Sequence, residues 1–415
     1  MSEAKAKAQA AKETTTALAG LSTAAKNEAL SRMADALIER APAIISANEA
    51  DLIRGREQGT SPSLLDRLKL TEERIAAIAE GVREVMRLPD PVGDVLESFT
   101  RPNGMHVEKS RVPLGVVGMI YEARPNVTVD AAALCLKTGN AVVLRGGSSA
   151  LNSNLAIVKV LREALAQTKI PADALQLIED PSRASVDEML KLNGLLDVVI
   201  PRGGASLIQN VVQNATVPVI ETGAGICHTY VDDSADPAMA EAIAFNAKMQ
   251  RPSVCNAMET LLVHESYARK HLAGLAAKFR AAGAELRGCE RTRALVPEAA
   301  AATEQDFATE YNDYILNIKI VTGVEEALAH IRRFGTRHSE CIVTETQANA
   351  DRFLQDVDAA AVYHNVSTRF TDGFEFGYGA EIGISTQKLH ARGPMGLPAL
   401  TSTKYRITGN GQIRG

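Results

Sequence analysis

The stretch Gly115-Val-Val-Gly-Met-Ile120 decides the fold class, because it begins a repeating pattern of apolar strands and helices. A helix-like segment follows at residues 127–138, and a Gly139-Asn140 turn then leads into the apolar run Ala141-Val-Val-Leu144. Similar runs return twice before residue 201, with helical segments between them. Continuous apolar strands that alternate with helices are typical of a parallel sheet covered on both faces. Sheets of this kind bind ligands at the carboxyl ends of their strands.

A second series of strands and helices lies further along the chain. Its apolar runs lie at residues 228–231, 259–263, 314–321 and 339–343. A chain of 415 residues is also long for one hydrophobic core. We therefore expect an α/β fold with two Rossmann-like parallel-sheet domains and a boundary near Gly223–Gly225.

The region before residue 95 is predicted to be helical. Five apolar residues recur at helical spacing and should face the core: Leu30, Met33, Ala34, Leu37 and Ile38. Thr71 is the predicted N-cap of a further helix, because Glu72 and Glu73 follow it and the apolar spacing continues to Val85.

A hairpin is predicted next. Segments 95–101 and 105–111 flank Pro102-Asn103-Gly104, and Asn-Gly is a strong hairpin signal because both residues tolerate positive φ. The hairpin has few apolar residues and buries little by itself, so we expect it to project and to pack against a partner subunit. Residues 393–415 are rich in Gly, Pro, Thr and Ser and are expected to be extended chain that needs docking to become ordered.

Composition excludes several classes of protein. The net charge of -5 and the pI of about 6.0 give no reason to expect a nucleic-acid or anionic-membrane partner. The sequence has neither an apolar run long enough for a transmembrane helix nor the pattern of a signal peptide. The five cysteines are widely spaced without a C-x-x-C pair, which argues against disulfides and a metal site. We expect a cytoplasmic protein without a metal.

Cys255 and Glu221 are the side chains best suited to chemistry. Lys248 and Arg251 precede Cys255, and such cations favour the thiolate, which is the nucleophilic form of cysteine. Taken alone, however, a single cysteine is more often a small buried residue. Glu221 follows a strand-like segment and precedes a Gly-rich turn, where a carboxylate either reaches a cleft or serves only as a cap or turn residue.

Two Gly-rich turns join a strand to a helix. They are Leu144-Arg-Gly-Gly-Ser-Ser-Ala150 and Ile200-Pro-Arg-Gly-Gly-Ala-Ser206. Glycines at such a turn let backbone N–H groups approach a phosphate, and an arginine can pair with it. Neither turn carries the G-x-G-x-x-G fingerprint, so each is a weak signal by itself.

These pieces, in this order, resemble the aldehyde dehydrogenase superfamily. Residues 113–120 and 139–144 look like the opening strands of its cofactor domain, and Glu221-Thr-Gly-Ala-Gly225 resembles its E-L-G-G base motif. Cys255 follows Glu221 by 34 residues (255 − 221), close to the superfamily's usual separation of base and nucleophile. Four longer segments look like the branch that reduces L-glutamyl 5-phosphate in proline biosynthesis: residues 120–126, 250–257, 364–370 and 385–396.

The resemblance implies an NADPH-dependent reduction of L-glutamyl 5-phosphate to L-glutamate 5-semialdehyde, with release of phosphate and a cysteine thioester as intermediate. It implies that residues 1–94 and 113–223 bind NADP and that residues 224–385 carry the nucleophile. Residues 95–112 and 386–415 would form an oligomerisation hairpin and a C-terminal segment. A homo-oligomer, either dimer or tetramer, and an association with the upstream glutamate 5-kinase are further expectations.

The resemblance also assigns roles to individual residues. The catalytic set is Cys255, Arg124, Asn126 and Glu221. The cofactor-binding set is Arg145, Gly146, Ser148, Ser149, Arg202, Gly203, Gly204 and Glu310. The substrate-binding set is Asn365, Ser367, Lys388 and Arg392, for which a purely structural role or a dimer contact is the alternative.

The sequence departs from the superfamily at two positions. Ordinary members have P-W-N where this chain has Glu122-Ala123-Arg124, so the oxyanion donor is either the backbone N–H of Cys255 or the side chain of Arg124 or Asn126. The stretch Tyr311-Asn312-Asp313 departs from the E-x-F-G-P pattern that begins at Glu310. A reductase has no need to activate water, so the role of Glu221 also stays open.

Three other functions remain open at this point. An NAD(P)-dependent oxidation of another small aldehyde keeps the fold and Cys255. A thiol acyltransferase or hydrolase needs no cofactor, so binding of NADPH distinguishes it. A non-catalytic scaffold partner would not need Cys255, Glu221 or Arg124.

Overall fold

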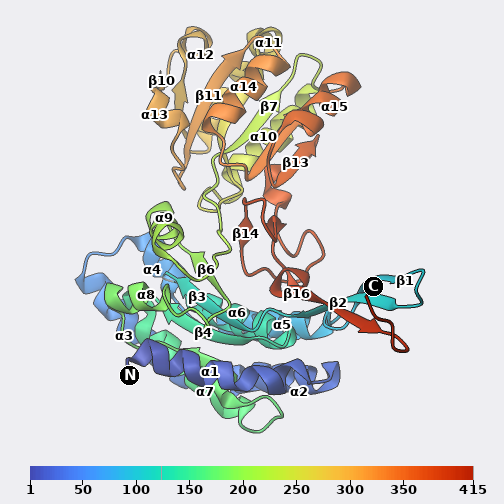
Figure 1. Cartoon of the computed structure of the whole chain (residues 1–415). Coiled ribbons are helices and arrows are strands. Elements are labelled where there is room, and N and C mark those ends of the chain that lie inside the picture. Colours follow the sequence, from blue (N-terminus) through green and yellow to red (C-terminus); the bar gives the residue numbers. More distant parts are fainter. Residues whose placement is uncertain (123, 415) are drawn as a thin grey trace. The chain divides into compact units, whose positions relative to one another are not determined.

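The computed structural model of the chain describes residues 1–122 and 124–414 (Figure 1). The chain divides into two compact units. Unit 1 comprises Met1–Glu221, Gly377–Gly383 and Met395–Gly415, and unit 2 comprises Thr222–Phe376 and Ile384–Pro394. Each unit contains a parallel sheet with helices, which confirms the predicted α/β class. Among the described residues, no helix has the length and apolar character needed to cross a membrane.

Helices form the first part of unit 1. They are α1 (Glu3–Ala19), α2 (Thr23–Glu39), α3 (Ala41–Glu57), α4 (Pro62–Leu68) and α5 (Glu72–Arg87). The cap of α5 is confirmed, because the Thr71 hydroxyl accepts a hydrogen bond of 3.2 Å from the backbone N–H of Arg74. In α2 the prediction for Ile38 is wrong, since its side chain is 44% exposed whereas Leu37 is buried. Ile38 lies about 100° around the helix axis from Leu37, on the solvent side.

The parallel sheet of unit 1 has the strand order β5-β4-β3-β6. Its strands are β3 (Val116–Tyr121), β4 (Ala141–Gly146), β5 (Leu175–Leu177) and β6 (Val198–Arg202). The connecting helices are α6 (Pro125–Lys137), η1 (Ser148–Ala150), α7 (Leu151–Leu165), η2 (Ala172–Ala174), α8 (Arg183–Met189) and α9 (Ala205–Asn214). All residues of β3 and β4 are buried, which explains their continuous apolar runs. The strand order reverses between β3 and β6, and such a switch point is where open sheets bind ligands.

A three-stranded antiparallel sheet extends from unit 1 (Figure 1). It consists of β1 (Val95–Thr100), β2 (His106–Pro113) and β16 (Thr401–Thr408), and η4 (Leu397–Leu400) leads into β16. The hairpin prediction is confirmed, and the positive φ of 86° in its turn is adopted by Gly104. Strand β16 pairs with β2 over its whole length, so residues 401–408 of the C-terminal segment are extended and docked as expected, whereas Leu397–Leu400 form the short helix η4.

Unit 2 contains a seven-stranded parallel sheet in the order β10-β9-β11-β8-β7-β12-β13. Its strands are β7 (Cys227–Val231), β8 (Met258–His264), β9 (Glu285–Gly288), β10 (Ala300–Ala301), β11 (Ile315–Val321), β12 (Ser339–Val343) and β13 (Ala361–His364). Its helices are α10 (Pro237–Met249), α11 (Glu265–Ala281), α12 (Glu290–Leu295), α13 (Glu304–Phe307), α14 (Val324–Phe334), α15 (Gln347–Asp356) and η3 (Thr368–Phe370). A short ribbon of β14 (Ile384–Ser385) and β15 (Gly393–Pro394) completes the unit. Apolar side chains pack on both faces of the sheet, which places the turns at strand ends in fixed positions.

Candidate active site

Cys255 lies in a tight turn between α10 and β8 of unit 2. The turn is closed by a hydrogen bond of 3.0 Å from the backbone N–H of Ala257 to the carbonyl oxygen of Val254. The Cys255 side chain is half-buried. A half-buried thiol on a turn is accessible to a ligand and is held by the rigid elements on either side.

The backbone of this turn is fixed from several directions. The carbonyl oxygen of Cys255 accepts a hydrogen bond of 3.2 Å from the thiol of Cys227. Gly225 packs so closely that a Cβ atom there would lie 1.4 Å from the same carbonyl oxygen. The next residue, Asn256, donates from its side chain to the carbonyl oxygen of Thr371 at 2.9 Å and accepts at its own carbonyl from the Thr368 hydroxyl at 2.7 Å. The position of Cys255 is therefore determined by the packing around it.

The other four cysteines are less suited to nucleophilic chemistry. Cys135, Cys227 and Cys341 are buried, and burial raises the pKa of each thiol, which reaches about 12 at Cys341. Cys289 is half-buried, but its thiol lies 3.3 Å from the hydroxyl of Thr292 at the start of α12. Buried thiols stay protonated and inert. Cys255 is consequently the cysteine best placed to react.

The cations expected near Cys255 are differently placed. Lys248 is fully buried and forms an ion pair of 2.8 Å with Glu259, where burial lowers the pKa of the lysine and raises that of Glu259 to about 7. Its charge is thus compensated within the core. Arg369, which is not among the predicted site residues, donates hydrogen bonds to the side chains of Gln250 and Asn256 on either side of Cys255. The sequence gives no signal for this contact, because Arg369 is more than a hundred residues away in the chain.

The remaining predicted residues of unit 2 all have partners within it. A Glu310 carboxylate oxygen accepts a hydrogen bond of 2.8 Å from the backbone N–H of Gly225. Asn365 binds both backbone groups of Thr344, and the Ser367 hydroxyl accepts from the backbone N–H of Arg369. Lys388 and Arg392 each lie 2.8 Å from a carboxylate oxygen of Asp358. These contacts agree with the structural alternative, and a substrate role for the four residues stays a prediction.

In unit 1 the turn after β6 lies at the switch point of the sheet. Glu122, at the end of β3, accepts a hydrogen bond of 3.0 Å from the backbone N–H of Gly204 at the start of α9. A Cβ atom at Gly203 would lie 2.5 Å from the Glu122 carboxylate and 2.7 Å from the Leu207 side chain, so a larger residue there would displace these two side chains. Arg202 ends β6 and is half-buried. Three of the predicted cofactor residues therefore lie together at this turn.

The turn after β4 carries the other predicted cofactor residues. Arg145 is buried, and its guanidinium donates to the carbonyl oxygens of Pro181 and Ser182 at 2.6 and 2.8 Å. Those contacts hold the loop before α8, so a phosphate-binding role for Arg145 stays a prediction. Gly146 is buried at the end of β4, whereas Ser148 and Ser149 are exposed in η1.

The three catalytic candidates of unit 1 lie at the ends of elements. Arg124 is the N-cap residue of α6. Asn126, in the first turn of α6, donates a hydrogen bond of 3.0 Å to Asp130, whose pKa is raised to about 6 by burial. Glu221 follows a short extended segment that hydrogen-bonds to β6 through Val199. Their catalytic roles are not tested by this arrangement and stay predictions.

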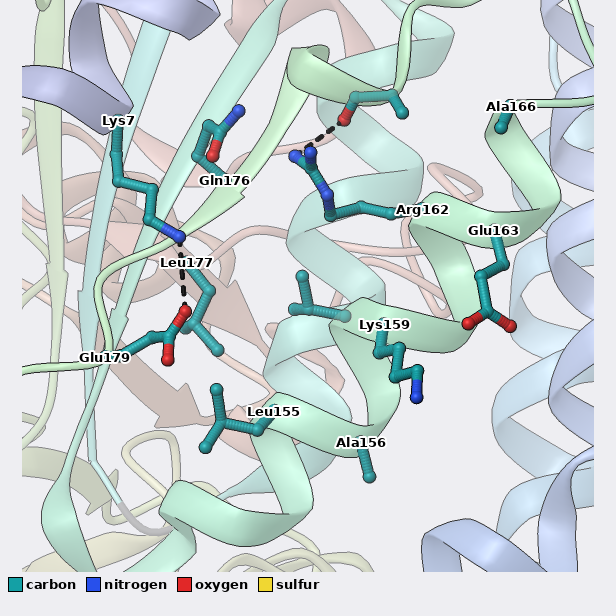
Figure 2. Close-up of a pocket in the computed structure, with 12 residues that line it drawn as sticks. Lys7, Leu155, Ala156, Lys159, Arg162, Glu163, Ala166, Gln176, Leu177 and Glu179 are labelled. Atoms are coloured by element: carbon teal, nitrogen blue, oxygen red, sulfur yellow. Dashed lines mark hydrogen bonds and ion pairs between the residues drawn. The ribbon is translucent and has the colours of Figure 1, made fainter.

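A cavity of about 640 Å³ also lies in unit 1, between α1, α7 and β5 (Figure 2). Lys7 forms an ion pair of 3.3 Å with Glu179 on its wall, and Arg162 donates to the carbonyl oxygen of Ala172 at 2.9 Å (Figure 2). No residue of the predicted catalytic or cofactor sets lines it. The cavity is separate from both turns described above.

Unit 1 has a parallel sheet with a Gly-rich turn at its switch point, and unit 2 has a second parallel sheet with a half-buried cysteine on a fixed turn. These features define an aldehyde-dehydrogenase-like oxidoreductase. Residues 1–288 match the aldehyde dehydrogenase family. γ-Glutamyl phosphate reductases are similar over the full length, with 59% identity for one from Bacillus licheniformis (100% of both chains) and 60% for one from Moorella thermoacetica (99% of both). The crystal structure of a γ-glutamyl phosphate reductase from Thermotoga maritima is 49% identical and covers 100% of both chains with a TM-score of 0.97. The chain belongs to the aldehyde dehydrogenase family and, within it, to the γ-glutamyl phosphate reductases.

Proposed function

We propose that the protein reduces L-glutamyl 5-phosphate to L-glutamate 5-semialdehyde, with NADPH as reductant and release of phosphate, in proline biosynthesis. The observation that carries this proposal is the fixed turn of Cys255, in a chain whose full-length relatives are named γ-glutamyl phosphate reductases. A thiolate is a strong nucleophile at neutral pH, and its acyl form is readily reduced. The alternative, oxidation of another small aldehyde, uses the same cysteine.

The proposed reaction begins with attack of the Cys255 sulfur on the acyl carbon. The carbon–oxygen bond to phosphate breaks, phosphate leaves, and a thioester remains on Cys255. NADPH, when bound, would supply the hydride that reduces this thioester. Collapse of the resulting thiohemiacetal expels the Cys255 thiolate and releases the aldehyde. The backbone N–H of Cys255, with Arg124 or Asn126, is the proposed donor to the oxyanion.

The residues at the switch point of unit 1 fit a dinucleotide cofactor. Gly203 and Gly204 place backbone at the start of α9, where the Gly204 N–H is donated to the Glu122 carboxylate, and Arg202 adds a positive charge. Arg145, Gly146, Ser148 and Ser149 are proposed to contact the cofactor from the turn after β4, and Glu310 is proposed to bind its ribose. Asn365, Ser367, Lys388 and Arg392 are the proposed ligands of the amino-acid part of the substrate.

The test is the reverse reaction with purified full-length protein. Glutamate 5-semialdehyde, NADP and inorganic phosphate should give NADPH, detected by its ultraviolet absorbance, and omission of phosphate should abolish the signal. Faster turnover of a simple aldehyde without phosphate would favour the alternative function. Failure to bind NADPH would instead favour a cofactor-free acyl transfer.

Replacement of the nucleophile gives a second test. Cys255→Ala should lower the rate by at least about a hundredfold while NADPH binding and the thermal midpoint persist, since loss of a covalent nucleophile costs several orders of magnitude. Cys289→Ala is the matched control, because Cys289 is the other half-buried cysteine among the described residues. A Cys255→Ala variant that keeps more than about one per cent of the rate would refute the mechanism.

A further inference from the structure

Arg369 spans the loop that carries Cys255. It lies in η3 of unit 2, and its Nε atom donates a hydrogen bond of 2.8 Å to the side-chain oxygen of Gln250. Its Nη1 atom donates to the side-chain oxygen of Asn256. Since Gln250 and Asn256 stand before and after Cys255 in the chain, these two bonds hold the guanidinium against the turn. The planar guanidinium of arginine has several N–H donors in a fixed arrangement, so it can form both hydrogen bonds at once.

The guanidinium of Arg369 donates its side-chain hydrogen bonds to neutral groups, while the carboxylate of Asp372 attracts its charge. Both of its side-chain acceptors are neutral amides, and within residues 1–122 and 124–414 it forms no ion pair with Asp or Glu. Arg280 and Arg287, by contrast, pair with Glu298 and Asp306 of the same unit. A half-buried cation held by neutral amides can attract a further anion, and such cations occur at functional sites.

The charged groups around Arg369 indicate which anion its guanidinium stabilises. Partial burial lowers the pKa of Arg369, and the like charge of Arg251 lowers it further, whereas negative charge at Cys255, Asp372 and Cys227 raises it. Cys227 is fully buried and remains a thiol, because burial and the nearby Glu340 raise its pKa well above the usual value. Cys255 is half-buried, so of the two cysteines it is the one that Arg369 can hold ionised, alongside its attraction to Asp372. Attraction between two charges is reciprocal, so Arg369 favours the ionised form of Cys255.

We propose that Arg369 is a positioning residue that acts through Cys255, holding its side chain as the thiolate before substrate binds. The inference rests on the proposed function only in treating Cys255 as the nucleophile. It assigns to Arg369 the task that the sequence suggested for Lys248 and Arg251. Lys248 instead neutralises Glu259, and Arg251 is exposed to solvent.

The test is alkylation of Cys255 by iodoacetamide across a range of pH, followed by mass spectrometry of the peptide that contains it. This measurement uses the full-length protein and needs neither substrate nor cofactor. In Arg369→Gln the pH midpoint of alkylation should rise by about one unit, which lowers the rate below the midpoint about tenfold. Arg369→Lys keeps the charge and should restore most of the rate. Arg280→Gln, a change of the same kind at an arginine that pairs with Glu298, should leave the profile unchanged.

Two outcomes would overturn the proposal. One is an unchanged midpoint in a folded Arg369→Gln protein, and the other is an equal shift in Arg251→Gln. If Arg369→Gln does not fold, Gln250→Ala releases the Nε bond alone and should move the midpoint in the same direction, and no movement there also refutes the idea. If the midpoint shifts but the enzyme turns over only simple aldehydes, the role of Arg369 is supported and L-glutamyl 5-phosphate is refuted as the substrate.

Discussion

Substitution of Gly225 by alanine should inactivate the enzyme by moving Cys255. The new Cβ atom would lie 1.4 Å from the carbonyl oxygen of Cys255, 2.4 Å from its carbonyl carbon and 2.9 Å from its Cα atom. Ordinary contacts of a Cβ atom begin at 3.4 Å, so the backbone of the turn must retreat by about 2 Å. All three of these atoms belong to the backbone, and no side chain can rotate away to relieve the clash.

The size of the effect follows from this displacement. A misplacement of about 1 Å at a reacting group costs roughly a hundredfold in rate. We therefore expect kcat/KM of Gly225→Ala to fall at least about a hundredfold, while crowding of the packed turn lowers the unfolding free energy by about 1–3 kcal/mol. The retreat would also stretch the 3.2 Å hydrogen bond from Cys227.

Phosphate-dependent NADPH formation and urea denaturation measure the two effects separately. Gly274→Ala is the matched control, because a Cβ atom at Gly274, in the middle of α11, meets nothing within 4 Å. That control should keep full activity and gain up to about 1 kcal/mol of stability. A Gly225→Ala enzyme with unchanged kcat/KM would refute the conclusion that close packing at Gly225 determines the position of Cys255.

Two further predictions concern the hairpin and the effect of pH. Gly104→Val should distort the β1–β2 turn, because valine does not readily adopt the φ of 86° that Gly104 has there. The mass of the predicted oligomer in sedimentation should then fall. An unchanged mass in a folded variant would argue against an oligomerisation role of the hairpin. Burial lowers the pKa of His338 from 6.5 to about 4. Between these two pH values the unfolded state therefore binds one proton more than the folded state. The unfolding free energy should fall by about 1.4 kcal/mol for each pH unit by which the pH is lowered in this range. His338→Gln should reduce that slope in urea melts at pH 4–6.5, and an identical slope would contradict the assignment.

Much of the fold could be predicted because local patterns determine it. The buried runs of β3 and β4 are continuous in the sequence, and Thr71 caps α5 through a contact three residues away. Ile38 was predicted wrongly because helical spacing alone does not show how far the neighbouring elements cover a helix. Strand β10 has only two residues, both exposed, and leaves no apolar run to recognise.

The candidate site is less predictable because its contacts join distant parts of the chain. Glu122 reaches Gly204 across the switch point, 82 residues away, and Arg369 reaches Asn256 over 113 residues. Proximity in the sequence suggested Lys248 as the cation beside Cys255. In the structure, however, Lys248 pairs with Glu259 of β8 inside the core. Motif resemblance predicts Cys255 as the nucleophile, and the structure shows which groups hold its turn.

The pairing of β16 with β2 also has a consequence for biosynthesis. Strand β2 ends at Pro113, and its partner begins at Thr401, so the ribosome adds almost 290 residues before this edge can be covered. At roughly 5–20 residues per second, the uncovered edge persists for about 15–60 s on each nascent chain. An open strand edge recruits other strands, and neighbouring chains on one messenger present the same edge. Chaperone capture of ribosome-bound chains should therefore concentrate on β2 until synthesis ends.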